Sequence, residues 1–477
     1  MIETSRPWRA LSAMAVANVI VTIDFFGLNT ALPTIGRELN GTTATLQWIA
    51  NIYLLFMAAP LIAAGRLGDL FGRRKLCVIG LGFLALGSLV AASAPNATIL
   101  IAARAASGVA ASLVAATSLA IVDSAFVPER RGYALGIYGA IGGVGSAIGP
   151  LVGGVITQWL SWRWFFLFQI PIIVISVVLT YTWCQETRED GASRHIDWIG
   201  TGLLTMGLFA LVFGLVRGPE VGWSNAAVVT GLVSGVVLLV AFFIAERMVP
   251  VPLIHLQMWR RARFSVPNAV AFVGNMAFGV TMFQLTLYLQ QVRNLSPSAT
   301  GVVFLAFTIP LAACAPLVGR AIGRIRVSVL MGGGAALLAV SFACFGAISL
   351  ESGIVLSLVG LFLAGCGQAG VFDVSNFAAL DAVPDSAMGE ASGTVNGVRQ
   401  IGTLVGLAMV GAVFNGVQQA NLRAGVAPNL AFVDALRPAM LVIGAVCAIT
   451  AVLTPVALWR VERVPSRGSA STSVSPQ

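Results

Sequence analysis

Apolar runs separated by short polar segments recur along the whole chain. A helix needs about 20 mainly apolar residues to cross a bilayer, and each run has roughly that length. The pattern predicts an all-α polytopic membrane protein with fourteen spans, at residues 10–33, 46–65, 76–94, 99–122, 133–157, 164–184, 198–216, 225–245, 266–290, 299–319, 327–349, 353–379, 391–414 and 438–459.

Composition supports this prediction. The chain of 477 residues is 57% hydrophobic and 10% charged, whereas a soluble domain has about 25% charged residues. A soluble fold could not bury so much apolar surface, so the lipid bilayer is the expected surrounding. The serine-rich segment 460–477 is expected to be a disordered cytoplasmic tail.

The distribution of cations predicts the topology. Of the 28 Lys and Arg residues, 20 fall in segments on the same side as the N-terminus, 6 fall on the opposite side, and Arg104 and Arg399 fall within spans. Cytoplasmic loops carry an excess of Lys and Arg. We therefore expect both termini to lie in the cytoplasm.

Glycine spacing indicates an internal repeat. Gly65 and Gly319 each precede an arginine and are 254 residues apart. Three more glycine pairs share an offset of 257, namely Gly136 with Gly393, Gly145 with Gly402 and Gly149 with Gly406. The repeat predicts two six-span halves, at 1–184 and 264–459, with a linker and two inserted spans at 185–263. Halves of this kind are a transporter architecture, with the substrate bound between them.

A compact charged turn, Gly65–Lys75, separates the second and third spans. Asp69 precedes Arg73 by one helical turn, and we expect it to meet a cation or a helix N-terminus of the other half. The turn would then hold the halves together at the cytoplasmic side. Its glycines permit tight turning and close helix approach; they are Gly65, Gly68 and Gly72.

Asp24 is the acid that the pattern places deepest in a span. A buried carboxylate is costly unless it faces a cavity, pairs with a cation or takes up a proton. Asp24 lies about 14 Å from the outer end of its span and Arg104 about 9 Å into another, at 1.5 Å per residue. The two side chains can therefore lie at similar depth. Asp373 is a second candidate for protonation.

The sequence lacks the residues that several other functions would require. Lys75 is the only lysine and follows Arg74, so no phosphate-binding Gly-Lys-Ser/Thr loop exists. His195 and His255 lie in linkers, and the six cysteines form no Cys-x-x-Cys pair, so no metal or other cofactor is expected. Basic clusters with interleaved aromatics are absent, which argues against nucleic-acid binding. An ion gradient is the remaining energy source, and a lone titratable carboxylate favours protons.

Four motifs resemble those of the major facilitator superfamily. Gly65–Lys75 is similar to its loop between spans two and three, and Arg104-x-x-x-Gly108 to its fourth-span motif. The segment 145–154 resembles the fifth-span antiporter motif, and Asp24-x-x-x-x-Asn29-x-Ala-Leu-Pro the first-span motif of fourteen-helix drug:proton antiporters. The resemblance covers essentially the whole chain, including the inserted spans.

The resemblance implies roles for these residues. Asp24 would alternate between a proton and a cationic drug, and Arg104 would tune its affinity for the proton. Close packing and a bend at the antiporter motif would bring the halves together and seal the site on one side. That motif comprises Gly145, Gly149, Pro150, Gly153 and Gly154.

Amide and aromatic side chains are candidates for the substrate cavity, because such groups suit large, flat cations. They are Asn29, Trp48, Asn51, Tyr53, Asn275, Gln284, Tyr288 and Gln291. Packing within the bundle or at the bilayer interface is the alternative for each of them.

The sequence therefore predicts a monomeric, proton-coupled exporter of hydrophobic, cationic drugs in the bacterial cytoplasmic (inner) membrane. An exporter dedicated to one endogenous metabolite or antibiotic is the alternative. A channel or membrane sensor fits the two-half repeat less well. An enzyme is disfavoured because the spans contain no His, Cys or paired-carboxylate constellation.

Overall fold

The computed structural model describes residues 6–58, 60–188, 197–249, 256–383 and 388–459. Within these ranges, 13 helices are long and apolar enough to cross a membrane, and one bent pair of helices completes a fourteenth span. The predicted all-helical fold with fourteen spans is confirmed. The tail predicted to be disordered, 460–477, lies outside the described residues.

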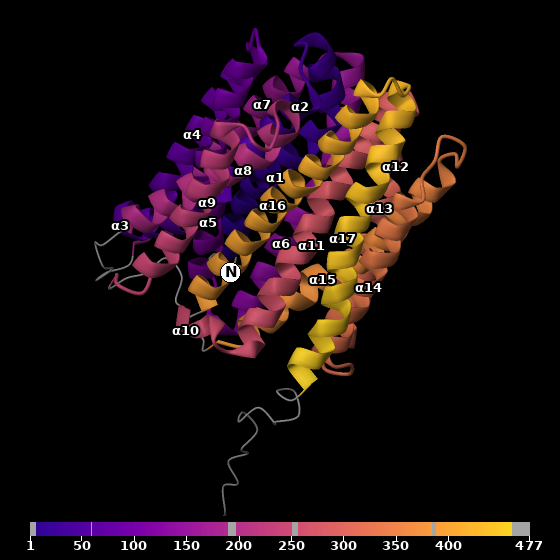
Figure 1. Ribbon diagram of the computed structural model, residues 1–477. Coiled ribbons are helices and arrows are strands. Elements are labelled where there is room, and N and C mark those ends of the chain that lie inside the picture. Colours follow the sequence, from indigo (N-terminus) through magenta and orange to yellow (C-terminus); the bar gives the residue numbers. More distant parts are fainter. Residues whose placement is uncertain (1–5, 59, 189–196, 250–255, 384–387, 460–477) are drawn as a thin grey trace, which may run out of the picture.

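The first six spans are formed by seven helices, which lie on the left in Figure 1. They are α1 (Arg6–Glu38), α2 (Thr43–Ala58), α3 (Leu61–Phe71), α4 (Arg73–Ala92), α5 (Ala97–Ala125), α6 (Pro128–Trp159) and α7 (Trp162–Trp183).

Two inserted spans and a short helix follow, and the last six spans fill the right-hand side of Figure 1 apart from one long helix that crosses the centre of the view. The inserted elements are α8 (Trp198–Val221), α9 (Ala226–Ala245) and α10 (Leu256–Trp259). The last six spans comprise α11 (Ala262–Leu287) with the π-helix η2 (Tyr288–Val292), α12 (Pro297–Val303), α13 (Leu305–Ala321), α14 (Val327–Gly346), α15 (Val355–Asp381), α16 (Met388–Arg423) and α17 (Pro428–Trp459).

The charged segment Gly65–Lys75 is mostly helical, and the prediction of an eleven-residue turn is wrong. The second span bends by 49° between α2 and α3, next to Pro60, which has no backbone N–H to donate. Helix α3 then continues to Phe71, and α4 begins at Arg73. Gly72 alone makes the turn, with φ of +106°, a conformation that favours glycine.

Two of the repeated glycine pairs pack in equivalent ways in the two halves. A side chain at Gly145 or Gly149 would meet α1, and a side chain at Gly402 or Gly406 would meet α11. Each pair therefore lets the fifth span of its half approach the first span closely.

The bundle has two ends, which we name by their charge. The basic end holds the start of α1, the turn at Gly72 and the end of α17; the far end holds the opposite helix termini. At the far end Gln290 Nε2 donates to the Thr30 carbonyl at 2.8 Å, and Asn415 Nδ2 donates to Gln47 Oε1 at 3.2 Å. These bonds join α1 to η2 and α2 to α16, so the halves are closed together here.

A second far-end contact joins α6 to α12. A side chain at Gly154 would meet the backbone of Pro297, and one at Gly301 would meet the Pro150 carbonyl. Of the antiporter-motif glycines, Gly154 thus faces the other half. Gly145, Gly149 and Gly153 pack on α1, so the prediction that the whole stripe lies between the halves is wrong. Four-residue spacing alone does not show which of two neighbours a helix face meets.

The inserted helix α8 lies along the seam between α2 and α16, one from each half. Trp48 of α2 packs against Phe209 and Phe213 of α8, with ring centroids 5.8 and 6.3 Å away. Helix α9 packs on α8 and leaves a row of valines exposed, as expected for a lipid-facing helix. The insertion therefore covers one of the two seams between the halves.

Gly154→Leu should open the far end, because the added side chain would collide with the backbone of α12. Gly143→Leu on the same helix is the matched control, since a side chain there meets open space. Spin labels at the exposed Leu160 and Leu430, with the native cysteines replaced, report the distance between the halves by electron–electron double resonance. We expect a longer distance in Gly154→Leu alone; equal distances in both variants would contradict this packing.

Candidate functional site

Asp24 and Arg104 form a buried ion pair between α1 and α5. Arg104 Nη1 lies 2.6 Å from Asp24 Oδ2, and the two side chains are 1% and 2% exposed. The guanidinium carbon also lies 4.0 Å from the centre of the Tyr53 ring, a cation–π arrangement. Arg104 Nε and Nη2 have no hydrogen-bond partner among the described residues, so this cation depends chiefly on Asp24 and Tyr53.

Gln169 of α7 is the fourth member of the site. Its Nε2 donates to the other carboxylate oxygen, Asp24 Oδ1, at 3.0 Å and to the Phe165 carbonyl at 3.3 Å. The site therefore gathers one side chain from each of four helices, α1, α2, α5 and α7. The arrangement holds a single carboxylate between a cation and an amide.

Glycine positions bring these helices together. Gly27 lies one turn after Asp24, and a side chain there would meet the Phe165 ring; Phe165 in turn lies one turn before Gln169. Gly108 lies one turn after Arg104, and a side chain there would meet the Tyr53 carbonyl. Small residues at these points let α7 reach α1, and let α5 reach α2, closely enough for polar contact.

An aromatic cluster links the site to the second half. Phe25 stacks with Tyr53 and contacts Phe26, with centroids 6.2 and 4.6 Å away. Phe26 contacts Phe278 of α11 at 4.8 Å, and Phe278 stacks on Phe307 of α13. Asp24 therefore lies next to a contact between the halves, and a change in its charge would act close to that contact.

The proposed cavity residues do not form one cluster. Tyr53 contacts Arg104, and Asn51 is fully buried with no hydrogen-bond partner for either amide atom among the described residues. Asn29 and Asn275 donate to carbonyls of their own helices. Gln284 and Tyr288 are buried in α11 and η2.

Two of these candidates lie away from the ion pair. Trp48 faces α8, as described above, and Gln291 is exposed in η2 at the far end. Sequence position could not separate cavity-facing from outward-facing residues, because the pairing of helices was unknown.

In the turn motif the charges pair within the first half. Asp69 Oδ1 accepts from Arg73 Nε at 2.9 Å, and Arg73 Nη1 donates to the Ala120 carbonyl at 3.4 Å. Glu186, which follows α7, accepts from the backbone N–H groups of Arg74 and Lys75 at 3.1 Å. The partner of Asp69 in this conformation is thus Arg73 and not a group of the other half.

Asp373 lies near a second buried arginine. Arg399 is 6% exposed; its Nη2 donates to the Phe372 carbonyl at 2.7 Å, and its guanidinium carbon lies 3.9 Å from the Phe372 ring centre. Among the described residues no carboxylate oxygen lies within 4.0 Å of Arg399. Asp373 therefore does not form an ion pair comparable with that of Asp24.

Sequence reasoning missed Gln169. The signal was present, because it is the only amide or charged side chain between Trp164 and the end of α7 at Trp183. A glutamine within an apolar span requires a polar partner. Its partner became visible only when α7 was placed beside α1.

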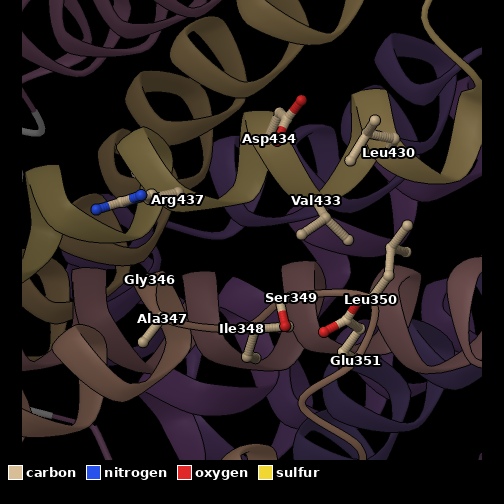
Figure 2. A pocket seen from close by; sticks show the side chains of 10 residues that line it. All are labelled: Gly346, Ala347, Ile348, Ser349, Leu350, Glu351, Leu430, Val433, Asp434 and Arg437. Carbon is tan, nitrogen blue, oxygen red and sulfur yellow. The ribbon is translucent and has the colours of Figure 1, made fainter.

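A separate hollow of about 550 Å³ lies at the far end of the second half. Figure 2 shows it between α17, which carries Asp434, and the loop that follows α14, which carries Glu351. It is lined by neither Asp24 nor Arg104, and we assign it no part in the site.

Comparison with known proteins identifies a family and several relatives of the chain. The sequence pattern of the Major Facilitator Superfamily matches residues 14–267, 198–407 and 268–475. The chain is 34% identical over 409 residues to the multidrug resistance protein Stp of Mycobacterium tuberculosis, covering 84% of this chain and 75% of that protein. It is 32% identical over 479 residues to the puromycin resistance protein pur8 of Streptomyces alboniger, covering 98% and 95%.

The fold also matches solved structures. The crystal structure of the POT family transporter PepTSo superposes with a TM-score of 0.70 at 14% sequence identity, covering 95% of this chain and 98% of that chain. At this identity the likeness concerns the fold alone.

Arg104→Gln should strongly destabilise the protein, because it leaves the Asp24 carboxylate buried without its cation. Breaking a buried pair costs roughly 3–5 kcal/mol, whereas breaking an exposed pair costs about 0–1 kcal/mol. We expect a clear fall in the melting temperature in detergent, and partial recovery in Asp24→Asn/Arg104→Gln. Arg217→Gln, which breaks the more exposed Arg217–Glu220 pair, is the control. Additive losses in the double variant would argue against a coupled pair.

Proposed function

The chain belongs to the major facilitator superfamily, and from this membership we propose that it is a proton-coupled antiporter that exports hydrophobic drugs or antibiotics. Members of this family are transporters, and the homologues of the chain are multidrug and antibiotic resistance exporters. The fourteen spans and the actinobacterial relatives place it in the bacterial cytoplasmic membrane. The observation that carries the proposal is the buried Asp24–Arg104 pair.

The pair supplies a mechanism for exchange. A carboxylate in this apolar site needs a positive partner, which can be Arg104, a proton or a cationic substrate. Binding of a cation at Asp24 would displace the proton, and protonation would release the cation. Since both ligands compete for one carboxylate, one leaves as the other binds.

The proton gradient would supply the energy. The sequence has no Gly-Lys-Ser/Thr loop for ATP. One charge moving through about 150 mV provides roughly 3.5 kcal/mol, enough for a concentration ratio of a few hundred. No cofactor is required for this chemistry, and protons and small-molecule substrates are the proposed ligands.

The contacts between the halves suggest the conformational step. With the basic end assigned to the cytoplasm by the positive-inside rule, closure at the far end corresponds to an inward-facing state. In the opposite state the basic end would close, and Asp69 would exchange Arg73 for a partner in the second half. The aromatic contact between Phe26 and Phe278 connects Asp24 to this movement.

A dedicated exporter of one antibiotic is the second candidate. It is favoured by relatives named for single compounds, such as the tetracenomycin C resistance and export protein of Streptomyces glaucescens, which is 29% identical over 408 residues. Export of a panel of dissimilar drugs would support the first candidate. Export of one compound alone would support the second.

Asp24→Asn should abolish substrate-driven proton release, because an amide has no proton to exchange. The measurement is the pH change inside proteoliposomes when tetraphenylphosphonium or puromycin is added. Asp24→Glu should retain part of the release. Asp123→Asn is the control, since Asp123 is 43% exposed and pairs with Arg131. Wild-type proton release in Asp24→Asn would refute the coupling role.

We also propose Asp373 as a second protonation group, because it lies in a span near the buried Arg399. Asp373→Asn should then lower the number of protons exchanged per substrate without abolishing transport. Simultaneous flux measurements of substrate and protons test this. An unchanged ratio would assign Asp373 a structural role.

A further inference from the structure

We propose that Gln169 is a positioning residue that forms a hydrogen bond with the Asp24 carboxyl group in both of its protonation states. The inference rests on the proposed function, in which Asp24 gains and loses a proton. Gln169 lies within α7 and is 1% exposed, so it is part of neither the protein surface nor the turn at Gly72.

The two ends of the Gln169 amide are used unequally. Its Nε2 donates to the Asp24 carboxylate and to the Phe165 carbonyl. Its Oε1 is buried and accepts no hydrogen bond from the described residues. An acceptor left unpaired in an apolar site is costly, and a packing role would be filled as well by an apolar side chain.

The unpaired acceptor has a use when Asp24 is protonated. An ionised carboxylate only accepts hydrogen bonds, whereas a carboxylic acid also donates one. Rotation of the amide about its last side-chain bond exchanges Nε2 and Oε1, so that Oε1 can accept from the new O–H of Asp24. The proton comes from water and stays on Asp24; no proton is transferred to the amide.

Of the titratable neighbours of Asp24, only the Tyr53 hydroxyl can also accept a hydrogen bond from it. Among the described residues, the titratable groups facing Asp24 are Arg104 from α5 and Tyr53 from α2. Arg104 has donors only, and therefore cannot accept from a protonated Asp24. Helix α6 faces α1 here with Gly145 and Gly149, and α11 with Phe278; none of these has a side-chain acceptor. Tyr53 Oη already donates to the Val21 carbonyl at 3.5 Å and its ring lies against Arg104, whereas Gln169 Oε1 is the acceptor that is left without a donor among the described residues.

Gln169→Met tests the inference, because methionine keeps the length but removes both donor and acceptor. A hydrogen bond to a charged group is stronger than one to a neutral group, so the ionised state of Asp24 loses more. We expect the pH midpoint of puromycin-driven proton release in proteoliposomes to move up by about one unit, a roughly tenfold change in proton affinity. Gln169→Glu, which places a second carboxyl beside Asp24, should move it further in the same direction.

Gln368→Met is the matched control, since Gln368 is equally buried, has neither amide atom paired among the described residues and lies on α15. Its midpoint should equal that of the wild type. An infrared difference spectrum between high and low pH adds a direct readout. The carboxylic acid band of Asp24, identified by its loss in Asp24→Asn, should shift in Gln169→Met because its acceptor is gone.

Four outcomes are decisive. A raised midpoint and a shifted band in Gln169→Met, with Gln368→Met unchanged, support the inference. A wild-type midpoint and band in Gln169→Met would overturn it while leaving the role of Asp24 intact. A uniform loss of rate at every pH with an unchanged midpoint would also overturn it, since that is the effect of a structural residue. Proton release that persists in Asp24→Asn would overturn both this inference and the proposed function.

Discussion

The burial of one carboxylate in an apolar bundle is the constraint on which the rest of the structure depends. Asp24 is compensated by Arg104, whose cation is in turn supported by Tyr53 and by few other groups. Holding these side chains together requires close helix contacts, which Gly27 and Gly108 permit. Separating the pair leaves a buried charge uncompensated, and in the proposed mechanism a proton or a cationic substrate takes the place of Arg104 beside Asp24.

The ion pair lies next to a contact between the two halves of the bundle. Asp24 immediately precedes Phe25 and Phe26, and Phe26 contacts Phe278 in the second half. The far-end closure uses hydrogen bonds between neutral groups, such as Gln290 to Thr30, and close backbone contact between α6 and α12. Such contacts are individually weak, and we propose that the ion pair determines when the far end opens and closes.

The sequence predicted the spans and the partners Asp24 and Arg104, because the length of apolar runs and the cost of burial are properties of the chain itself. It did not predict which neighbour each helix face meets. Gly145 and Gly154 have the same appearance in sequence but pack on different halves. Trp48 and Gln169 were misjudged or missed for the same reason, since the position of α8 beside α2 and of α7 beside α1 emerges only from the tertiary fold.

The central claim is that a proton and a cationic substrate compete for Asp24. Equilibrium binding of tetraphenylphosphonium to the purified protein in detergent, measured across pH without any gradient, tests it most directly. The account predicts that the Kd rises about tenfold for each unit of pH below the midpoint, and that this dependence disappears in Asp24→Asn. A wild-type Kd that does not change with pH would contradict the account.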